Sequence, residues 1–195
     1  MTVRIESGIE AVVFDIGKVL VEWDMRLLFA KLIPDPDELD WFARTVVTPE
    51  WHFQHDAGRP AAEMVAERSA EYPAYAHAIR AWVERFNETI PGEVPGTADL
   101  VEALDSAGMP LYAITNFGAD TWAGFRPTFP LLDRFRDIVV SGVERLAKPD
   151  PAIYRLAERR FGHAPGAMLF IDDSLPNVEA ARACGWQAHH FTGAP

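Results

Sequence analysis

The sequence has a single cysteine, no long apolar run and a shortage of positive charge. Cys184 is the only cysteine among 195 residues, so an intrachain disulfide is impossible and a reducing compartment is expected. No apolar run approaches the roughly 20 residues that a membrane-spanning helix requires, so no membrane partner is expected. Lysine and arginine number 18 against 29 aspartates and glutamates, a net charge of −11. This balance argues against nucleic acid as a partner, because binding to phosphate backbones needs a basic face.

The first residues and the length narrow the class of protein further. Residues 1–10 mix acidic and basic side chains and lack the basic start and apolar centre of a secretory signal, so we expect a cytoplasmic protein. A chain of 195 residues can bury a full core, and it fits one ordinary domain or one domain with a substantial insertion. No pattern in the sequence indicates an oligomeric state.

One short stretch, residues 11–17, combines a buried strand with a single carboxylate. The apolar, β-branched run before Asp15 predicts a strand that carries this side chain to its carboxyl end, where open α/β sheets bind ligands. Gly17 tolerates a positive φ, so the backbone can turn back and bring a carbonyl oxygen beside the carboxylate. The two oxygens could then share a cation. Alternatively, Asp15 only caps the element that follows the strand.

The region from Met25 to Thr89 differs in character from the rest of the chain. Its apolar residues recur at helical spacing, with prolines as interruptions and no strand-like alternation. Helices are predicted at 25–33, 37–47, 60–71 and 75–86, and the Pro- and Gly-rich segment 90–96 is typical of a hinge. We therefore predict an all-helical cap over residues 24–90, inserted into a core of residues 1–23 and 91–195.

Beyond this hinge, strands and helices alternate. Strands are expected at 111–115, 137–141, 168–172 and 187–191, and helices at 96–108, 119–125, 151–161 and 175–184. Such alternation predicts a parallel sheet with right-handed crossovers. The predicted fold class is α/β, with a Rossmann-like parallel sheet core and a helical cap inserted after its first strand.

Polar side chains follow three of these strands. They are Asp15, then Thr115 and Asn116, and then Asp172 and Asp173. Because the carboxyl ends of parallel strands lie at one edge of the sheet, these residues should converge on one cleft. The hydroxyl of Thr115 and the backbone N–H groups after it suit a phosphate oxygen.

Lys148 lies in a loop just before a predicted helix. Pro149 and Pro151 restrict the backbone on its carboxyl side. A lysine among three aspartates could balance their charge and hold an anion, which matters in a protein that is strongly negative overall.

Four segments together resemble the ordered motifs of the haloacid dehalogenase-like (HAD) hydrolase superfamily. They are Asp15-Ile16-Gly17, Ile114-Thr115-Asn116, Lys148-Pro149 and the segment 170–177. The likeness covers nearly the whole chain and includes a helical cap between the first and second motifs. It implies a hydrolase with the α/β core and cap described above.

The resemblance implies a role for each residue that matches a motif. Asp15 would be the nucleophile and form an aspartyl intermediate, which splits one difficult displacement into two easier ones. Thr115, with the backbone of Asn116, would hold the transferring group. Lys148 would neutralise developing charge and orient Asp15.

The resemblance also implies Mg²⁺ as the cofactor. Its ligands would be the Asp15 carboxylate, the Gly17 carbonyl and Asp173, since Mg²⁺ prefers hard oxygen ligands. Asp172 would contact the metal through water or position Lys148. Asn177 stands where many relatives have a further acid.

Gly17 departs from the usual phosphatase pattern, which has a second aspartate at this position as general acid and base. The proton for the leaving group would then come from a cap residue or from water, or be needed less by a good leaving group. Some sugar-phosphate phosphatases of the superfamily are similar in having glycine there. The main prediction is a Mg²⁺-dependent phosphatase whose partner is a small phosphorylated substrate, a phosphate monoester.

Two other functions stay open. A metal-independent 2-haloacid dehalogenase also lacks the second aspartate, and Tyr154 fits its pattern, whereas Val19 and the Asp172-Asp173 pair do not. Adjacent carboxylates near a third are costly to keep ionised without a cation, which favours metal-dependent phosphoryl transfer. A catalytically silent domain that binds a phosphorylated ligand or a protein is the other alternative.

His52 and His55 are the remaining candidate site residues. They lie one helical turn apart in the predicted cap, with Asp56 beside them. Binding of substrate, replacement of the missing proton donor, a transition-metal site and ordinary surface exposure are all open to them. We carry both as candidate substrate-binding residues.

Overall fold

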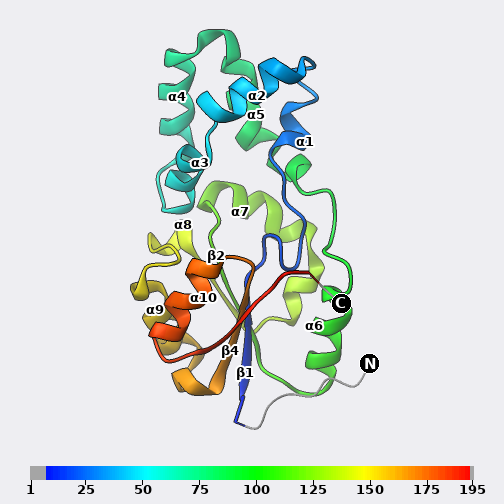
Figure 1. Ribbon diagram of the computed structural model, residues 1–195, viewed down its shortest axis with the longest axis vertical. Coiled ribbons are helices and arrows are strands. Elements are labelled where there is room, and N and C mark those ends of the chain that lie inside the picture. The colour runs from blue at the N-terminus through cyan, green and yellow to red at the C-terminus, as the bar shows by residue number, and fades with distance from the viewer. Residues whose placement is uncertain (1–7, 194–195) are drawn as a thin grey trace.

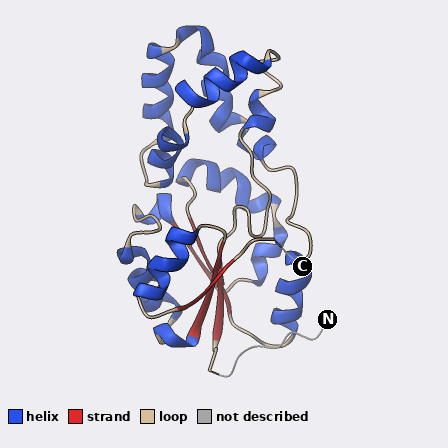
Figure 2. Cartoon of the chain, viewed as in Figure 1, coloured by secondary structure: helices blue, strands red, loops and turns tan. Residues whose placement is uncertain are grey.

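The protein is built around one parallel sheet of five strands in the order β3-β2-β1-β4-β5. The computed structural model describes residues 8–193, so most of the predicted polar segment 1–10 lies outside the described residues. The strands are β1 (Ala11–Phe14), β2 (Leu111–Thr115), β3 (Asp137–Val140), β4 (Met168–Asp172) and β5 (Gln187–His190). The predicted α/β class and parallel core are confirmed (Figures 1 and 2).

The chain between β1 and β2 is helical, as predicted. It forms α1 (Arg26–Phe29), α2 (Pro36–Thr45), α3 (Pro49–Asp56), α4 (Ala61–Glu71) and α5 (Ala76–Glu84), with short 3-10 helices at Pro73–Tyr75 and Phe86–Thr89. Figure 1 shows this helical insertion at one end of the molecule, beyond the carboxyl ends of the strands. The helix predicted at 25–33 is a single turn, α1, and α3 is a helix that the spacing of apolar residues did not reveal.

Further helices cover both faces of the sheet. They are α6 (Thr97–Ser106), α7 (Ala119–Phe125), α8 (Ser141–Glu144), α9 (Pro151–Phe161) and α10 (Leu175–Ala183), with 3-10 helices at Arg126–Thr128, Pro130–Arg134 and Pro165–Ala167. Helix α6 lies on one side of the sheet, α9 and α10 lie on the other, and α7 lies between the sheet and the insertion (Figure 1). Among residues 8–193, no helix is both long and apolar enough to cross a membrane.

Side chains of β1 are buried on both faces, because helices cover the sheet on both sides. Val12 and Phe14 pack into one apolar cluster, whereas Ala11 and Val13 pack into the other. The alternation follows from the period of two in a strand. Burial on both faces explains why this parallel strand is a continuous apolar run in the sequence.

The first of these clusters extends without a break from the sheet into the helical insertion. From Phe14 it continues through Leu20 and Phe29 to Trp51 and Trp82. Residues of both parts are therefore buried in the same core. The insertion is held above the strand ends by this shared apolar packing.

The chain turns sharply after β1. The residue in the left-handed region is Lys18, with φ of 60°, and the expectation of a positive φ at Gly17 is wrong. The amide of Lys18 donates to the carbonyl of Val21 (2.6 Å), and the amide of Val21 donates to that of Ile16 (3.0 Å). This compact turn leaves Asp15 just past the end of the strand.

Close packing of α8 under the β2–α7 loop yields a test of the fold. A Cβ at Gly142 would lie 2.5 Å from the amide nitrogen of Ala119 and 2.7 Å from the carbonyl oxygen of Phe117. The backbone would have to shift to relieve these clashes. Gly142→Ala should therefore lower the free energy of unfolding by about 1–3 kcal/mol, as measured by urea denaturation.

The matched control is Gly124→Ala. Its Cβ would meet nothing within 4 Å, and it replaces glycine inside α7. It should leave the free energy of unfolding unchanged or raise it by up to about 1 kcal/mol. Equal stabilities of the two variants would contradict the packing described for α8.

Candidate active site

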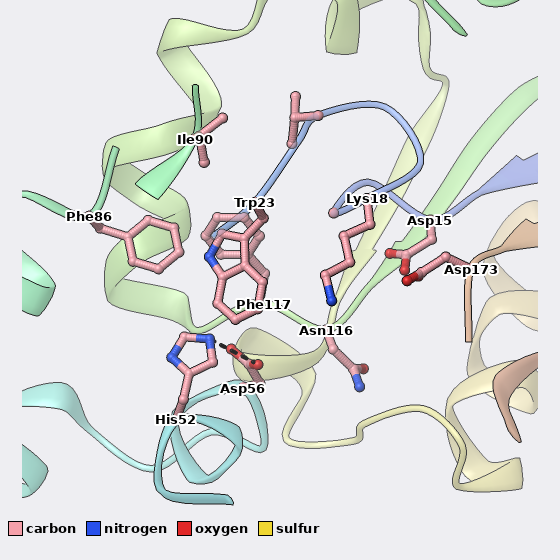
Figure 3. Close-up of a pocket in the computed structure, with 12 residues that line it drawn as sticks. Asp15, Lys18, Trp23, His52, Asp56, Phe86, Ile90, Asn116, Phe117 and Asp173 are labelled. Atoms are coloured by element: carbon pink, nitrogen blue, oxygen red, sulfur yellow. Dashed lines mark ion pairs between the residues drawn. The ribbon is translucent and has the colours of Figure 1, made fainter. Parts of the chain in front are cut away.

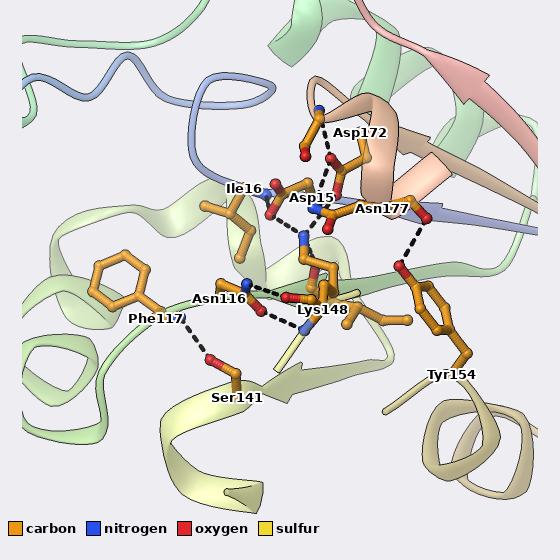
Figure 4. Close-up of polar contacts among 11 residues, drawn as sticks. Asp15, Ile16, Asn116, Phe117, Ser141, Lys148, Tyr154, Asp172 and Asn177 are labelled. Carbon is orange, nitrogen blue, oxygen red and sulfur yellow. Dashed lines mark hydrogen bonds and ion pairs between the residues drawn. The ribbon is translucent and has the colours of Figure 1, made fainter. Parts of the chain in front are cut away.

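Three adjacent strands bring the candidate residues to one edge of the sheet. Asp15 follows β1, Thr115 ends β2 and Asn116 follows it, and Asp172 ends β4 with Asp173 beyond it. Strand β1 pairs with β2 on one side and with β4 on the other, so their carboxyl ends adjoin. Figure 4 shows the polar contacts that link Asp15, Asn116 and Asp172 through Lys148.

Lys148 is the centre of these contacts. Its Nζ lies 2.8 Å from Oδ1 of Asp15 and 2.7 Å from Oδ2 of Asp172, and it donates to the carbonyl of Ile114 at 2.9 Å. The side chain is fully buried. All three of its donors thus have acceptors within the site, which fixes the position of the charge.

The Asn116 side chain holds the backbone of Lys148. Its Nδ2 donates to the carbonyl oxygen of Lys148, and its Oδ1 accepts from the amide of Lys148, both at 2.9 Å. This double hydrogen bond ties the loop before α9 to the end of β2. The lysine therefore enters the site from a loop that is itself held in place.

Asp172 is fully buried and both of its oxygens are engaged. Oδ1 accepts from the amide of Ser174 (2.8 Å) and from Nδ2 of Asn177 (3.0 Å). Oδ2 accepts from Lys148 and, at 3.1 Å, again from Asn177. Of the two roles open to Asp172, this geometry favours the positioning of Lys148.

The charges of the site act strongly on one another. Burial raises the pKa of Asp15 to about 7; the charge of Lys148 lowers it in part, and that of Asp172 raises it further. Burial on its own would lower the pKa of Lys148, but the charges of Asp15 and Asp172 raise it above its usual value. Lys148 is consequently a permanent cation in the site.

Three carboxylates meet near this single buried lysine. One oxygen each from Asp15, Asp172 and Asp173 lies within 4.8 Å of the others. Burial and the charge of Asp172 raise the pKa of Asp173. Hard oxygen donors and an excess of negative charge fit a divalent cation such as Mg²⁺. Asp15 and Asp173, with Gly17 on the same pocket wall, are the residues that could hold it.

A cavity of about 180 Å³ opens between the sheet edge and the helical insertion. One end is polar and the other is apolar and largely aromatic (Figure 3). The polar lining is Asp15, Gly17, Lys18, Asn116 and Asp173, and the remaining lining is Val21, Trp23, His52, Asp56, Phe86, Ile90 and Phe117. A ligand here would meet charged groups at one end and rings at the other.

Some of the site residues predicted from the sequence line this cavity, and others are buried behind its wall. Asp15, Asn116, Asp173 and His52 line the cavity, and Thr115 is buried at the end of β2. His55 lies behind the wall: its ring packs directly on Gly118, and its Nδ1 is 2.9 Å from the carbonyl oxygen of Arg59.

Asp56 also lines the cavity, although the sequence drew attention to it only as a neighbour of the two histidines. It is the last residue of α3, four positions after His52, so both side chains lie on one helix face. The sequence does contain a signal for the start of this helix. Thr48 caps α3 by accepting from the amide of Trp51 (3.1 Å), and Pro49 follows at the first helical position.

Solved structures share this fold. A HAD family enzyme from Bacteroides thetaiotaomicron, in complex with magnesium and inorganic phosphate, superposes with a TM-score of 0.74 at 20% identity, over 96% of this chain and 96% of that one. L-2-haloacid dehalogenase from Xanthobacter autotrophicus superposes with a TM-score of 0.64 at 18% identity, over 92% of this chain and 76% of that one. At these identities the likeness concerns the fold.

Curated relatives are distant in sequence. The sesquiterpene phosphatase astK of Aspergillus oryzae is 25% identical over 94% of this chain and 90% of its own length. Mouse acyl-CoA dehydrogenase family member 10 is 27% identical over 90% of this chain, which spans only 17% of that protein. The family model for haloacid dehalogenase-like hydrolases matches residues 9–185, nearly the whole chain. The chain therefore belongs to the haloacid dehalogenase-like hydrolase family.

Proposed function

We propose that this protein is a Mg²⁺-dependent phosphatase that hydrolyses a small organic phosphate monoester through an aspartyl-phosphate at Asp15. The observation that carries the proposal is the group of three carboxylate oxygens within 4.8 Å of one another beside the buried Lys148. A dehalogenation needs no such excess of negative charge. A divalent cation would compensate this negative charge and so allow an anionic substrate to bind.

The contacts of Asp15 indicate which of its oxygens reacts. Oδ1 accepts from the amide of Ile16 (2.7 Å) and lies beside Lys148. Oδ2 is then the oxygen that attacks phosphorus, while Lys148 favours the ionised form of Asp15 and orients it. Thr115 and the backbone of Asn116 would hold the phosphoryl oxygens. Mg²⁺, when bound, supplies positive charge that stabilises the transferring phosphoryl group.

Relatives and the cavity support the reaction class and the kind of substrate. One relative is named a sesquiterpene phosphatase, and one structural neighbour was crystallised with magnesium and inorganic phosphate. The apolar end of the cavity, formed by residues such as Trp23, Phe86 and Phe117, suits an alcohol portion with an apolar body.

The helical insertion would act as the cap predicted over residues 24–90. Its two connections run side by side, because the amide of Asp24 donates to the carbonyl of Thr89 and that of Glu22 to Gly92, both at 2.9 Å. Paired connections of this kind would let the insertion move as a unit. Its closure would exclude water while the phosphoryl group is transferred.

Phosphate release from aryl and sugar phosphates tests the proposal. With Mg²⁺ the protein should release inorganic phosphate, and EDTA should abolish this activity. Asp15→Asn should reduce turnover to background because the amide is no nucleophile. Its circular dichroism spectrum should be unchanged, since the amide is close in size to the carboxylate. Wild-type-like turnover by this variant would rule out Asp15 as nucleophile.

The same assay separates the alternative functions. Chloride release from 2-chloropropionate that resists EDTA would identify a dehalogenase instead. Inactivity in both assays, combined with tight binding of a phosphorylated compound, would identify a binding domain. Either result would overturn the phosphatase proposal.

A second prediction concerns the metal. Asp173→Asn should raise the Mg²⁺ concentration needed for half-maximal activity by at least about tenfold, because a ligand carboxylate loses its charge. The thermal stabilisation of the protein by Mg²⁺ should weaken in parallel. Asp133→Asn, at an exposed surface ion pair with Arg126, is the control and should match the wild type. A metal titration unchanged in Asp173→Asn would remove Asp173 from the ligand set.

A further inference from the structure

We propose that Asp56 is the general acid and base of this site, in place of the acid that Gly17 does not supply. The inference rests on the proposed phosphatase function. It assigns a catalytic role to a side chain of the helical insertion. The reaction would then be completed by a carboxyl group from a different part of the chain from the nucleophile.

Asp56 faces the same cavity as the nucleophile. It is only 8% exposed, and it lines the cavity together with Asp15 and Asp173 (Figure 3). Asp15 is engaged by Lys148, and Asp173 belongs to the proposed metal site. Among the described residues that line the cavity, Asp56 is the carboxyl group with neither of these tasks.

His52 is excluded as the proton donor by its own contacts. The indole Nε1–H of Trp82 donates to Nδ1 of His52 at 3.1 Å, so the proton of the neutral ring lies on Nε2. A charged ring would set an N–H against the indole N–H, and burial lowers the pKa of His52 to about 4. Its Nε2 lies 3.5 Å from Oδ2 of Asp56, close enough to help position that carboxyl group, which makes His52 a positioning residue.

Asp56 is held by the core as well as by its own helix. The amide of Gly118 lies near its carboxyl group, and the hydroxyl of Ser141 donates to its backbone carbonyl at 2.6 Å. The same Ser141 oxygen accepts from the amide of Phe117 at 2.9 Å. The end of α3 is thereby fixed against the loop that follows β2, at the edge where Asp15 lies.

The environment adjusts the acidity of Asp56 to its task. Burial raises its pKa to about 7; the amide of Gly118 and the charge of Lys148 lower it in part, and the charge of Asp15 raises it. Lys18 and Asp173 line the same cavity, and the ring of His52 on the same helix is neutral. Near neutral pH the carboxyl group can therefore both give and take a proton.

The carboxyl group of Asp56 gives up a proton in the first step of the reaction and regains one in the second. In the first, Oδ2 of Asp15 attacks phosphorus, the bond from phosphorus to the alcohol oxygen breaks, and protonated Asp56 gives its proton to that oxygen. In the second, water attacks phosphorus and transfers a proton to the Asp56 carboxylate. The bond to Asp15 breaks and inorganic phosphate leaves. Asp56 is then protonated again.

Two aryl phosphates of similar shape test this role. Phenyl phosphate releases phenol, a weak acid with a pKa of about 10 that needs protonation, whereas 2,4-dinitrophenolate leaves without a proton. Asp56→Asn should lower kcat/KM for phenyl phosphate by about 10²- to 10⁴-fold. With 2,4-dinitrophenyl phosphate it should give a burst of one product per enzyme molecule and then slow turnover, since the second step lacks its base.

Control measurements distinguish a failure of the role proposed for Asp56 from a failure of the proposed phosphatase function. Asp120→Asn is the matched control: Asp120 also joins core and insertion, by accepting from the amide of Ala61 (3.0 Å), and its variant should keep wild-type rates on both substrates. Equal losses of kcat/KM on both substrates, or no loss on either, would overturn the role of Asp56 while the wild-type activity stands. A wild type inactive on both would overturn the proposed function itself.

A measurement on the wild type covers the case in which Asp56→Asn does not fold. The ratio of kcat/KM for phenyl phosphate to that for 2,4-dinitrophenyl phosphate cancels the ionisation of Asp15, and above about pH 7, where both phosphates are dianions, it no longer depends on their ionisation. It should fall as the pH rises through about 7, because only the reaction with the poorer leaving group needs the protonated form of Asp56. A ratio that stays flat across neutral pH would contradict the proposal.

Discussion

The buried ammonium of Lys148 is the interaction on which the site depends. It lies within 2.8 Å of a carboxylate oxygen of Asp15 and of Asp172, and its side chain has no exposure. Removing one member of such a buried group leaves an uncompensated charge, typically at a cost of about 3–5 kcal/mol. Strands β1, β2 and β4 must therefore end together, with Asn116 and Asn177 holding the lysine and its partner.

This arrangement leaves more negative than positive charge at the sheet edge. Asp15, Asp172 and Asp173 face one buried cation, in a protein whose net charge is −11. An anionic substrate would be repelled by the protein as a whole and could bind only where positive charge is concentrated. A divalent cation beside Lys148 would supply that concentration, which makes metal binding and anion binding interdependent in the proposed reaction.

The parallel core could be predicted because its signals are local. Strands β1, β2 and β4 are short apolar runs with a polar residue at or just after the end, and parallel pairing brings these ends together independently of the loops. The helical insertion was harder to predict. Apolar spacing at 25–33 indicated a full helix, yet α1 is one turn, and the position of α3 depends on packing against Trp82 and Gly118. Contacts between distant segments leave no periodic trace in the sequence.

The placement of Asp56 has a consequence for how the two parts of the chain would work together. An acid two residues after Asp15 would be in position regardless of where the insertion lies. An acid at the end of α3 is in position only while α3 lies against Gly118 and Ser141. In the proposed mechanism, proton transfer is consequently coupled to closure of the insertion over the substrate. Glycine at position 17 is then compatible with hydrolysis, because the proton donor is assembled by closure.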